Sequence, residues 1–442
     1  MVAAMALLVG ACAHPRPAPA KLCAYRAYPL SVNSGGLQPT QRDPLADQIG
    51  AAFDEQAAHR AEAPPGSAAT TPPEYLVLSG GSEHGAFGAG FFHGMRSIPS
   101  YDIVTGVSTG SLQSTFLFLA NQPVPKDRTY GWVSGPLASR IKPGTSNTGD
   151  LALAYSIAKE SDIITPVRGG FLGGLAKGAL ATFGPLRARL KALISPDTLR
   201  LVKQQSAPPY SRRLFVGTVN LDDGNGYAID LTELASRIDT ANWTGTVDEL
   251  QECYVDAMIA SSSVPPAAFP VSLQIADPGG TRTNLYMDGG ARFGVFIEPI
   301  LRELGDRATQ DARIDLIVNG ALYGGPWLQN GQPVKDWSSL SVAARAVSVL
   351  ENQVYRFSVG TTESFGMRHG GVSMAFISNE NLPVGAPDPD NWVFDGKTCS
   401  AWNAIDNLQK QMEFHPNYMA CLSDYGRGRG AVPQWNWVKD KP

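Results

Sequence analysis

Charge and cysteine are both scarce in this 442-residue chain, and each shortage excludes a class of function. Charged residues make up 17% of the sequence and the formal net charge is −4, so the chain lacks the positive charge that drives nucleic-acid binding. Beyond the N-terminal segment no run of 18 apolar residues occurs, which predicts no membrane-spanning helix. The five cysteines lack zinc-ligand spacing. We therefore expect no nucleic-acid partner, no metal and no cofactor.

The abundant residues are apolar. Hydrophobic residues make up 43% of the chain, which is typical of a globular protein with a sizeable core. The length exceeds that of a usual single domain, but large α/β enzymes commonly hold such a chain as one domain with insertions. We expect that organisation here.

The first 12 residues are apolar and end in Val-Gly-Ala-Cys, which resembles the lipobox of bacterial lipoproteins. This interpretation makes residues 1–12 a signal segment and Cys12 the lipidated first residue of the mature protein. It predicts a lipoprotein anchored to a membrane of the bacterial cell envelope, on the periplasmic or outer-membrane side. No Lys or Arg precedes Arg16, so the usual positive region is missing. The alternative is an apolar terminus with an incidental cysteine.

The other four cysteines form an even set that suits an oxidising compartment. They are Cys23, Cys253, Cys399 and Cys421. The pair Cys399 and Cys421 is favoured because the two are close in sequence, with Cys23 and Cys253 next. Sequence alone leaves the connectivity open.

Composition divides the rest of the chain. Residues 13–73 are rich in Ala and Pro, which predicts an extended tether. Residues 74–390 are expected to form the catalytic domain, with a mostly helical insertion over 121–211. Residues 391–442 are rich in Trp, Asn and Gly, which predicts a loop-rich C-terminal extension.

The most informative stretch is the Gly-Val-Ser-Thr-Gly sequence over 106–110. Apolar residues before it predict a strand, and apolar residues at helical spacing follow it. A strand that ends in Gly-x-Ser-x-Gly and continues as a helix is the context of a nucleophile elbow, a sharp turn that exposes a serine Oγ. We therefore predict that Ser108 is a nucleophile.

An earlier predicted strand, over 75–78, leads into a glycine-rich turn at 79–85. Backbone N–H groups at the start of the following helix favour negative charge, so this turn suits a phosphate or an oxyanion. A Walker loop is excluded because no Gly-Lys-Ser/Thr follows, and residues 82–84 interrupt the spacing of a dinucleotide loop. A plain strand-to-helix turn is the other interpretation.

A third glycine-marked site is Asp-Gly-Gly over 288–290, which follows a predicted strand and brings one carboxylate into a turn. Strands and helices alternate across the whole body. That alternation predicts an α/β layered fold with a largely parallel sheet.

In this order the three sites resemble those of the bacterial patatin-like phospholipase family, over about residues 74–320. The resemblance implies a three-layer α/β/α fold and lipid acyl hydrolysis by a dyad of Ser108 and Asp288, acting on a phospholipid or another acyl ester. It implies oxyanion donors among Gly80, Gly81, Ser82, Gly85 and Thr109, with His84, Gly106, Gly110, Gly289 and Gly290 supporting the motifs. The family usually has glycine at the position of Ser82 and a basic residue at that of His84.

An aspartate with the ordinary pKa near 3.9 is a weak base. We therefore expect Asp288 to lie in a desolvated site that raises its proton affinity. Two alternatives remain. One is a Ser-Asp-His triad that uses His369 or His415, following the chain order of α/β-hydrolases. The other is an envelope lipoprotein that binds lipid or a partner without turnover.

Overall fold

The computed structural model describes residues 16–30, 50–51, 54–55, 58, 73–169, 178–265, 267–277, 280–297, 300, 312–320, 322, 328–329, 332–335 and 337–440. The proposed lipobox and Cys12 lie outside the described residues, as does most of the stretch 31–72. Among the described residues, no helix is both long enough and apolar enough to span a membrane.

Five parallel strands form the centre of the sheet, in the order β6-β3-β2-β10-β13. The sequences of these strands are mostly apolar because both faces of the sheet are covered. Their bounds are β2 Glu74–Leu78, β3 Ile103–Val107, β6 Arg213–Asn220, β10 Arg313–Val318 and β13 Gly371–Phe376. The strands predicted from the sequence before the glycine-rich turn and before the 106–110 sequence, β2 and β3, are confirmed.

Antiparallel strands extend both edges of this centre. On one side β7 (Gly226–Asp230) pairs with β6, and β1 (Ala27–Leu30) pairs with β7. The hairpin of β8 (Val271–Asp277) and β9 (Gly280–Asp288) joins the end of β6, and β16 (Trp437–Asp440) closes the other edge on β13. Three two-stranded ribbons lie apart: β4 Thr165–Pro166 with β5 Ala181–Thr182, β11 Leu328–Gln329 with β12 Gln332–Pro333, and β14 Val393–Phe394 with β15 Lys397–Thr398.

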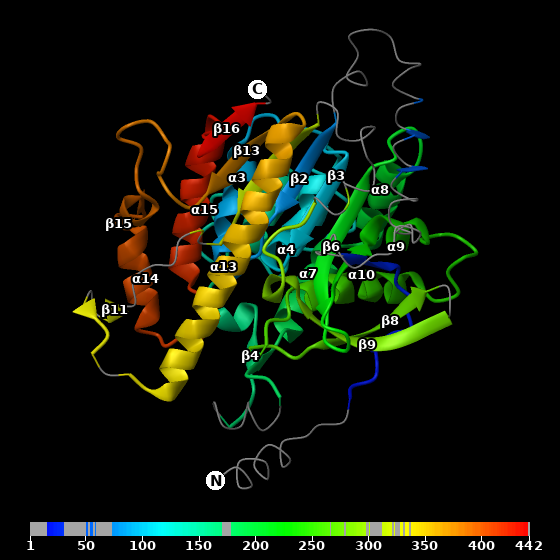
Figure 1. Ribbon diagram of the computed structural model, residues 1–442, viewed down its shortest axis with the longest axis horizontal. Coiled ribbons are helices and arrows are strands. Elements are labelled where there is room, and N and C mark those ends of the chain that lie inside the picture. Colours follow the sequence, from blue (N-terminus) through cyan, green and yellow to red (C-terminus); the bar gives the residue numbers. More distant parts are fainter. Residues whose placement is uncertain are drawn as a thin grey trace.

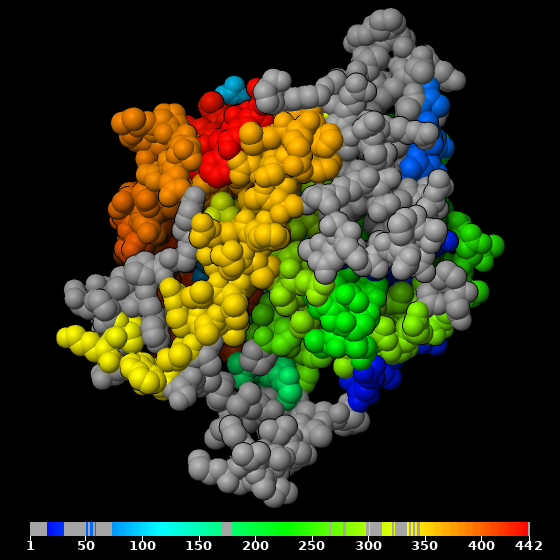
Figure 2. Space-filling model, viewed as in Figure 1, coloured from blue at the N-terminus to red at the C-terminus, as the bar shows by residue number. Residues whose placement is uncertain are grey.

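Two separate cores show that helices cover both faces of the sheet. Alternate residues of β2 divide between them: Leu76 and Leu78 belong to the core under α3, α4, α10 and α15, whereas Tyr75 and Val77 belong to the core under α13. Figure 1 shows α13 crossing the near face of the sheet, with the other helices behind it. In the space-filling view one side of α13 stays at the surface (Figure 2). The predicted three-layer α/β/α fold with a mostly parallel sheet is confirmed.

The described helices begin and end as follows: α3 Gly85–Gly94, α4 Thr109–Phe118, α5 Asn147–Ala154, α7 Gly184–Leu193, α8 Pro196–Ser206, α9 Leu231–Ser236, α10 Val247–Ser261, α13 Ser339–Arg368, α14 Cys399–Asn407 and α15 Pro416–Ala431, with 3-10 turns η2 Ser82–His84, η3 Glu160–Asp162, η4 Gly289–Ala291 and η5 Pro389–Asn391.

The insertion over 121–211 is less helical than predicted. Helices α5, α7 and α8 lie in it, but residues 121–146 form turns. Buried side chains take the place of helical hydrogen bonds there. Asn147 donates to the carbonyls of Leu119 and Gln122, and Arg128 donates to the carbonyl of Leu193. The prediction of a mostly helical insertion is wrong because such side-chain partners leave no periodic signal in the sequence.

The predicted tether over 13–73 is wrong for residues 16–30, which pack on the body. Strand β1 pairs with β7, Cys23 forms a disulfide with Cys253 of α10, and Tyr25 donates to the Cys253 carbonyl at 2.8 Å. The Ala and Pro content did not reveal this because four residues suffice for an edge strand once a disulfide holds them.

The predicted loop-rich extension over 391–442 is also wrong. It contains α14, α15 and β16, and the second disulfide joins Cys399 to Cys421. Its glycines face a neighbouring helix: a Cβ at Gly426 would lie 2.9 Å from Phe91 N of α3, and one at Gly430 would lie 2.8 Å from the Phe91 carbonyl carbon. These glycines permit close helix packing, and the boundary at residue 390 separates no domain. Both favoured disulfide pairs are present.

Candidate active site

Ser108 lies at the turn between β3 and α4, as the elbow prediction requires. Its φ of +53° is unusual for a residue with a side chain, and it is nearly buried, with 6% of its surface exposed. The flanking glycines meet backbone. A Cβ at Gly106 would lie 2.6 Å from the Gly110 carbonyl carbon, and one at Gly110 would lie 2.7 Å from the Ser79 carbonyl oxygen. The elbow therefore needs glycine at both positions.

Two serines at the C-terminal end of α10 hold the elbow in place by hydrogen bonds. Ser261 Oγ accepts a hydrogen bond from Ser108 N at 3.1 Å and donates to the Gly217 carbonyl at 2.6 Å, while Ser262 Oγ donates to the Ser108 carbonyl at 3.1 Å. These bonds tie the nucleophile turn to both α10 and β6. Ser108 is thus fixed in a strained conformation by its surroundings.

Asp288 ends β9 and is 2% exposed. Its backbone N donates to the Ser263 carbonyl at 3.0 Å, and its Oδ1 accepts from Gly290 N at 2.6 Å. A Cβ at Gly289 would lie 2.7 Å from the Gly217 carbonyl oxygen, so glycine lets this turn approach β6. The Asp-Gly-Gly motif therefore brings the carboxylate to the end of the sheet where Ser108 lies.

Burial raises the pKa of Asp288 to about 7, because water no longer solvates its charge. Hydrogen bonding from the Ser108 hydroxyl and from Gly290 N opposes that rise, while the charges of Glu351 and Glu413 add to it. Asp288 Oδ2 has no aligned hydrogen bond within the described part of the chain. The Ser108 hydroxyl therefore lowers the pKa of the Asp288 carboxyl without making a hydrogen bond of ordinary geometry to Oδ2. The expected desolvated Asp288 is confirmed.

The glycine-rich turn at 79–85 follows β2, the strand beside β3. It therefore lies next to the elbow, at the carboxyl ends of the parallel strands. Gly81 has φ +140° and Ser82 has φ +50°. The N–H groups of Gly81 and Ser82 have no acceptor among the hydrogen bonds of the described residues. Thr109 N is the first N–H of α4 and has no intrahelical partner. These three groups are available to a ligand.

Gly80 and Gly85 were predicted as residues of the oxyanion hole, but their N–H groups are bonded within the protein in this conformation. Gly80 N donates to the Gly294 carbonyl at 3.3 Å, and Gly85 N donates back into η2. Both are needed for space instead. A Cβ at Gly80 would lie 3.0 Å from Ser108 Cβ, and one at Gly85 would lie 2.7 Å from the ring of Tyr155.

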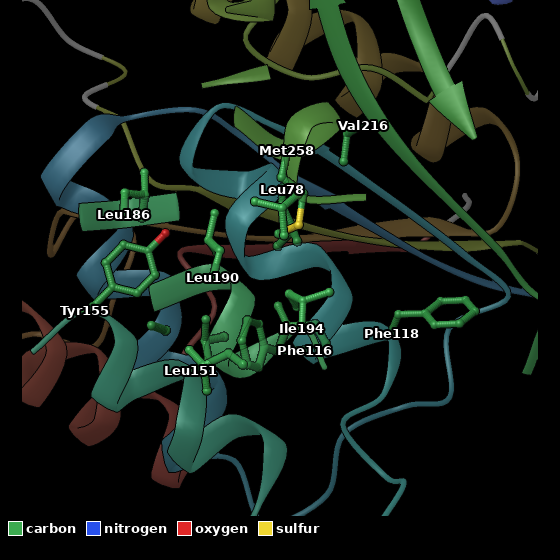
Figure 3. Close-up of a cluster of buried hydrophobic side chains, with 14 of the residues drawn as sticks. Leu78, Phe116, Phe118, Leu151, Tyr155, Leu186, Leu190, Ile194, Val216 and Met258 are labelled. Atoms are coloured by element: carbon green, nitrogen blue, oxygen red, sulfur yellow. The ribbon is translucent and has the colours of Figure 1, made fainter. Parts of the chain in front are cut away.

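A mainly apolar cavity of about 90 Å³ opens beside Ser108. The 121–211 insertion supplies much of its wall, α4 supplies another side, and the tail supplies residues 412–414. Figure 3 shows five of the lining residues gathered in one cluster: Phe116, Leu151, Tyr155, Leu186 and Leu190. The cavity suits an acyl chain better than a charged group.

Three residues near Ser108 carry no signal in the sequence. Tyr155 donates to the Thr109 carbonyl at 3.0 Å. Tyr355 of α13 is buried with its ring against Gly80, Gly290 and Gly294. Burial and the charge of Asp288 raise its pKa well above the ordinary value. Glu413 lines the cavity. None of the three belongs to a sequence motif. Tyr155 lies in the insertion, Tyr355 lies in α13, and Glu413 lies in the tail that was expected to form loops.

The two histidines of the alternative triad are engaged elsewhere. His415 Nδ1 pairs with the Glu83 carboxylate at 2.9 Å. His369 follows α13 and stacks on Phe365, just before β13 begins. Strands β13 and β3 run in the same direction, His369 precedes β13 and Ser108 follows β3. His369 therefore lies at the amino ends of the strands, and Ser108 lies at their carboxyl ends. Within the described residues, no group of three or more His, Cys, Asp or Glu side chains is arranged to hold a metal ion.

Comparison with known proteins agrees with this geometry. The family model described as patatin-like phospholipase matches residues 76–301. No curated protein matches the chain. Among solved structures, the chain is similar to the crystal structure of VipD from Legionella pneumophila, at 12% identity and a TM-score of 0.27. The match covers 81% of this chain and 66% of that one, slightly less than two thirds of its length. The family model spans half of the chain and contains the glycine-rich turn, the elbow and Asp288, and on that match the chain belongs to the patatin-like phospholipase family.

Proposed function

We propose that this protein is a serine-dependent lipid acyl hydrolase that uses Ser108 and Asp288 as a catalytic dyad. One observation carries the proposal: a strained serine lines an apolar cavity, and its hydroxyl acts on a buried aspartate with a pKa of about 7. Family membership supports lipid acyl hydrolysis as the reaction.

In the first step Ser108 Oγ attacks the ester carbonyl carbon while Asp288 accepts the hydroxyl proton. The leaving alcohol takes that proton as the acyl-enzyme forms. Water then attacks the acyl-enzyme, Asp288 accepts its proton, and the proton returns to Ser108 as the free acid leaves. A carboxyl with a pKa near 7 can both accept and return a proton at neutral pH.

The oxyanion of each tetrahedral intermediate would be held by the N–H groups of Gly81, Ser82 and Thr109. Losing one such donor typically costs about 3–4 kcal/mol of transition-state stabilisation. The apolar cavity would take the acyl chain, which leaves the alcohol part of the substrate toward solvent.

The decisive experiment uses the purified protein with p-nitrophenyl esters and a fluorophosphonate probe. We expect turnover and labelling by the wild type, both lost in Ser108→Ala, and turnover reduced at least ~10³-fold in Asp288→Asn. His369→Ala is the matched control and should retain activity. A wild type that neither turns over esters nor reacts at Ser108 would favour the alternative of a lipid- or partner-binding protein without turnover.

We also propose that the protein is an envelope lipoprotein anchored through Cys12, on the strength of the lipobox resemblance. An anchor would hold the site near its lipid substrate. Metabolic labelling with an alkyne fatty acid should modify the wild type and not Cys12→Ala. Equal labelling of both, or of neither, would contradict the anchor.

A further inference from the structure

The tail segment, residues 412–415, lies against the glycine-rich turn rather than apart from the site. Met412, Glu413 and Phe414 line the same cavity as Ser82 and Ser108. The segment leads directly into α15, which packs on α3, the helix that follows the turn. The tail segment precedes α15 and the glycine-rich turn precedes α3, so both are attached to one pair of packed helices.

Two carboxylates from distant parts of the chain hold the backbone of the tail segment. Glu160 of the insertion accepts the N–H groups of three consecutive residues, Met412 at 2.9 Å, Glu413 at 2.7 Å and Phe414 at 3.1 Å. Glu83 of η2 accepts His415 N at 2.8 Å and pairs with its ring. Asp406 accepts Asn417 N and Tyr418 N at the start of α15. The segment is thus fixed on both sides.

Contacts from the tail reach two consecutive residues of the turn. The Ser82 side chain and Glu413 line the same cavity wall, and the Ser82 hydroxyl lowers the pKa of Glu413, while Glu83 pairs with His415. Ser82 holds a φ of +50°, which is disfavoured for a residue with a side chain. The usual glycine of the family would need no such support. The tail segment thus lies beside Ser82, the position at which this sequence departs from the family pattern.

Charge also connects the tail to the proton acceptor. Burial raises the pKa of Glu413, the Ser82 hydroxyl lowers it, the carboxylates of Glu83 and Glu160 raise it, and His84 lowers it. The charged groups that act on Asp288 are Glu351 of α13 and Glu413, and both raise its pKa. Glu413 therefore contacts the oxyanion side of the site and acts electrostatically on the other side.

We propose that Glu413 is a positioning residue of this active site, which holds Ser82 with its N–H toward the oxyanion. The inference rests on the proposed function. It makes the C-terminal tail a working part of the catalytic centre.

Two variants separate the two effects of Glu413. In Glu413→Ala both the contact and the charge are lost, and we expect kcat to fall about 10–100-fold with little change in KM. In Glu413→Gln a polar side chain of the same length stays beside Ser82, so kcat at its plateau should stay within about threefold of the wild type. In both variants loss of the negative charge favours ionised Asp288. The rise of kcat/KM with pH should then move to lower pH.

A structural readout keeps the test independent of turnover. Hydrogen exchange of the backbone amides over 79–85 should speed up in Glu413→Ala and not in Glu413→Gln. Glu363→Ala is the matched control, because Glu363 pairs with Lys439 of the same tail away from the site. It should change neither exchange in the turn nor the pH profile.

The outcomes are distinct. Unchanged kcat, pH profile and exchange in Glu413→Ala would overturn the inference, as would a lower Tm accompanied by no change in the other three. A wild type without esterase activity whose turn exchanges faster in Glu413→Ala would instead reject the proposed function and keep the positioning role.

Discussion

The site has two sides that are built differently. The nucleophile side, formed by the turns at 106–110 and 288–290, has the glycines that the family pattern requires, and backbone atoms lie against three of them, Gly106, Gly110 and Gly289. The oxyanion side, formed by the turn at 79–85, has Ser82 and His84 instead of the usual residues and is braced by Glu413 and His415 of the tail. One side is specified by short motifs, and the other depends on a segment over 300 residues away in the sequence.

This difference shows how a departure from a motif can be accommodated. A turn that needs φ > 0 is satisfied by glycine at no steric cost, or by another residue that the surroundings hold in place. The first solution is local and the second requires tertiary contacts. Substitutions on the two sides should therefore differ in size and in how far their effects spread.

The largest effect is expected at Asp288. Its folded-state pKa of about 7 lies roughly three pH units above the ordinary value, so folding is destabilised by its ionisation as pH rises from about 4 to 7. That difference corresponds to about 4 kcal/mol at pH 8. Asp288→Asn should raise Tm at pH 8, with the gain shrinking toward pH 4, while activity is lost. Thermal melts across this pH range check it. An equal Tm at every pH would show that Asp288 is not desolvated in solution.

A smaller but still large loss is expected at the elbow. The Cβ of Gly110→Ala has only backbone atoms to displace, and overpacking of this kind costs about 1–3 kcal/mol. Urea denaturation should show that loss together with little remaining labelling at Ser108. Gly131→Ala is a fair comparison, since a Cβ there meets nothing within 4 Å. Should Gly110→Ala behave like Gly131→Ala, the nucleophile side would not be fixed by its glycines.

The smallest effect is expected at Ser82. Ser82→Gly accepts φ +50° without strain, so stability should change by less than about 1 kcal/mol. Activity should fall less than in Glu413→Ala. Because glycine needs no brace, adding Glu413→Ala to Ser82→Gly should cost little further kcat. A double-mutant cycle measures this coupling. Additive losses would mean that Glu413 does not act through Ser82.

Much of the fold followed from short patterns. The buried parallel strands, the strand-turn-helix around Ser108 and the carboxylate before Gly289 were all predicted, because apolar runs and glycine turns are local signals. The errors came where composition is ambiguous. Alanine and proline predicted a tether at 16–30, and glycine predicted loops after 391. In the structure a disulfide and a glycine-lined helix interface overrule both.

The donors of the glycine-rich turn illustrate the same limit. Gly80 and Gly85 were predicted in the oxyanion hole together with Gly81, Ser82 and Thr109, yet Gly80 N and Gly85 N are used within the protein. Sequence shows which residues surround a site, but not which hydrogen bonds they have already made. Tyr355 and Glu413 were missed for a related reason, since neither belongs to a motif and both arrive from elements packed on opposite faces of the sheet.

By itself the sequence predicted the strand and turn around Ser108 and the aspartate before Gly289, because each depends on neighbours within a few residues. Only the tertiary structure decided how strong a base Asp288 is, since that depends on burial and on the charges of Glu351 and Glu413. It also decided which N–H groups remain available and that the tail lies against the glycine-rich turn. Those properties come from desolvation and from contacts between distant segments, and no local pattern encodes either.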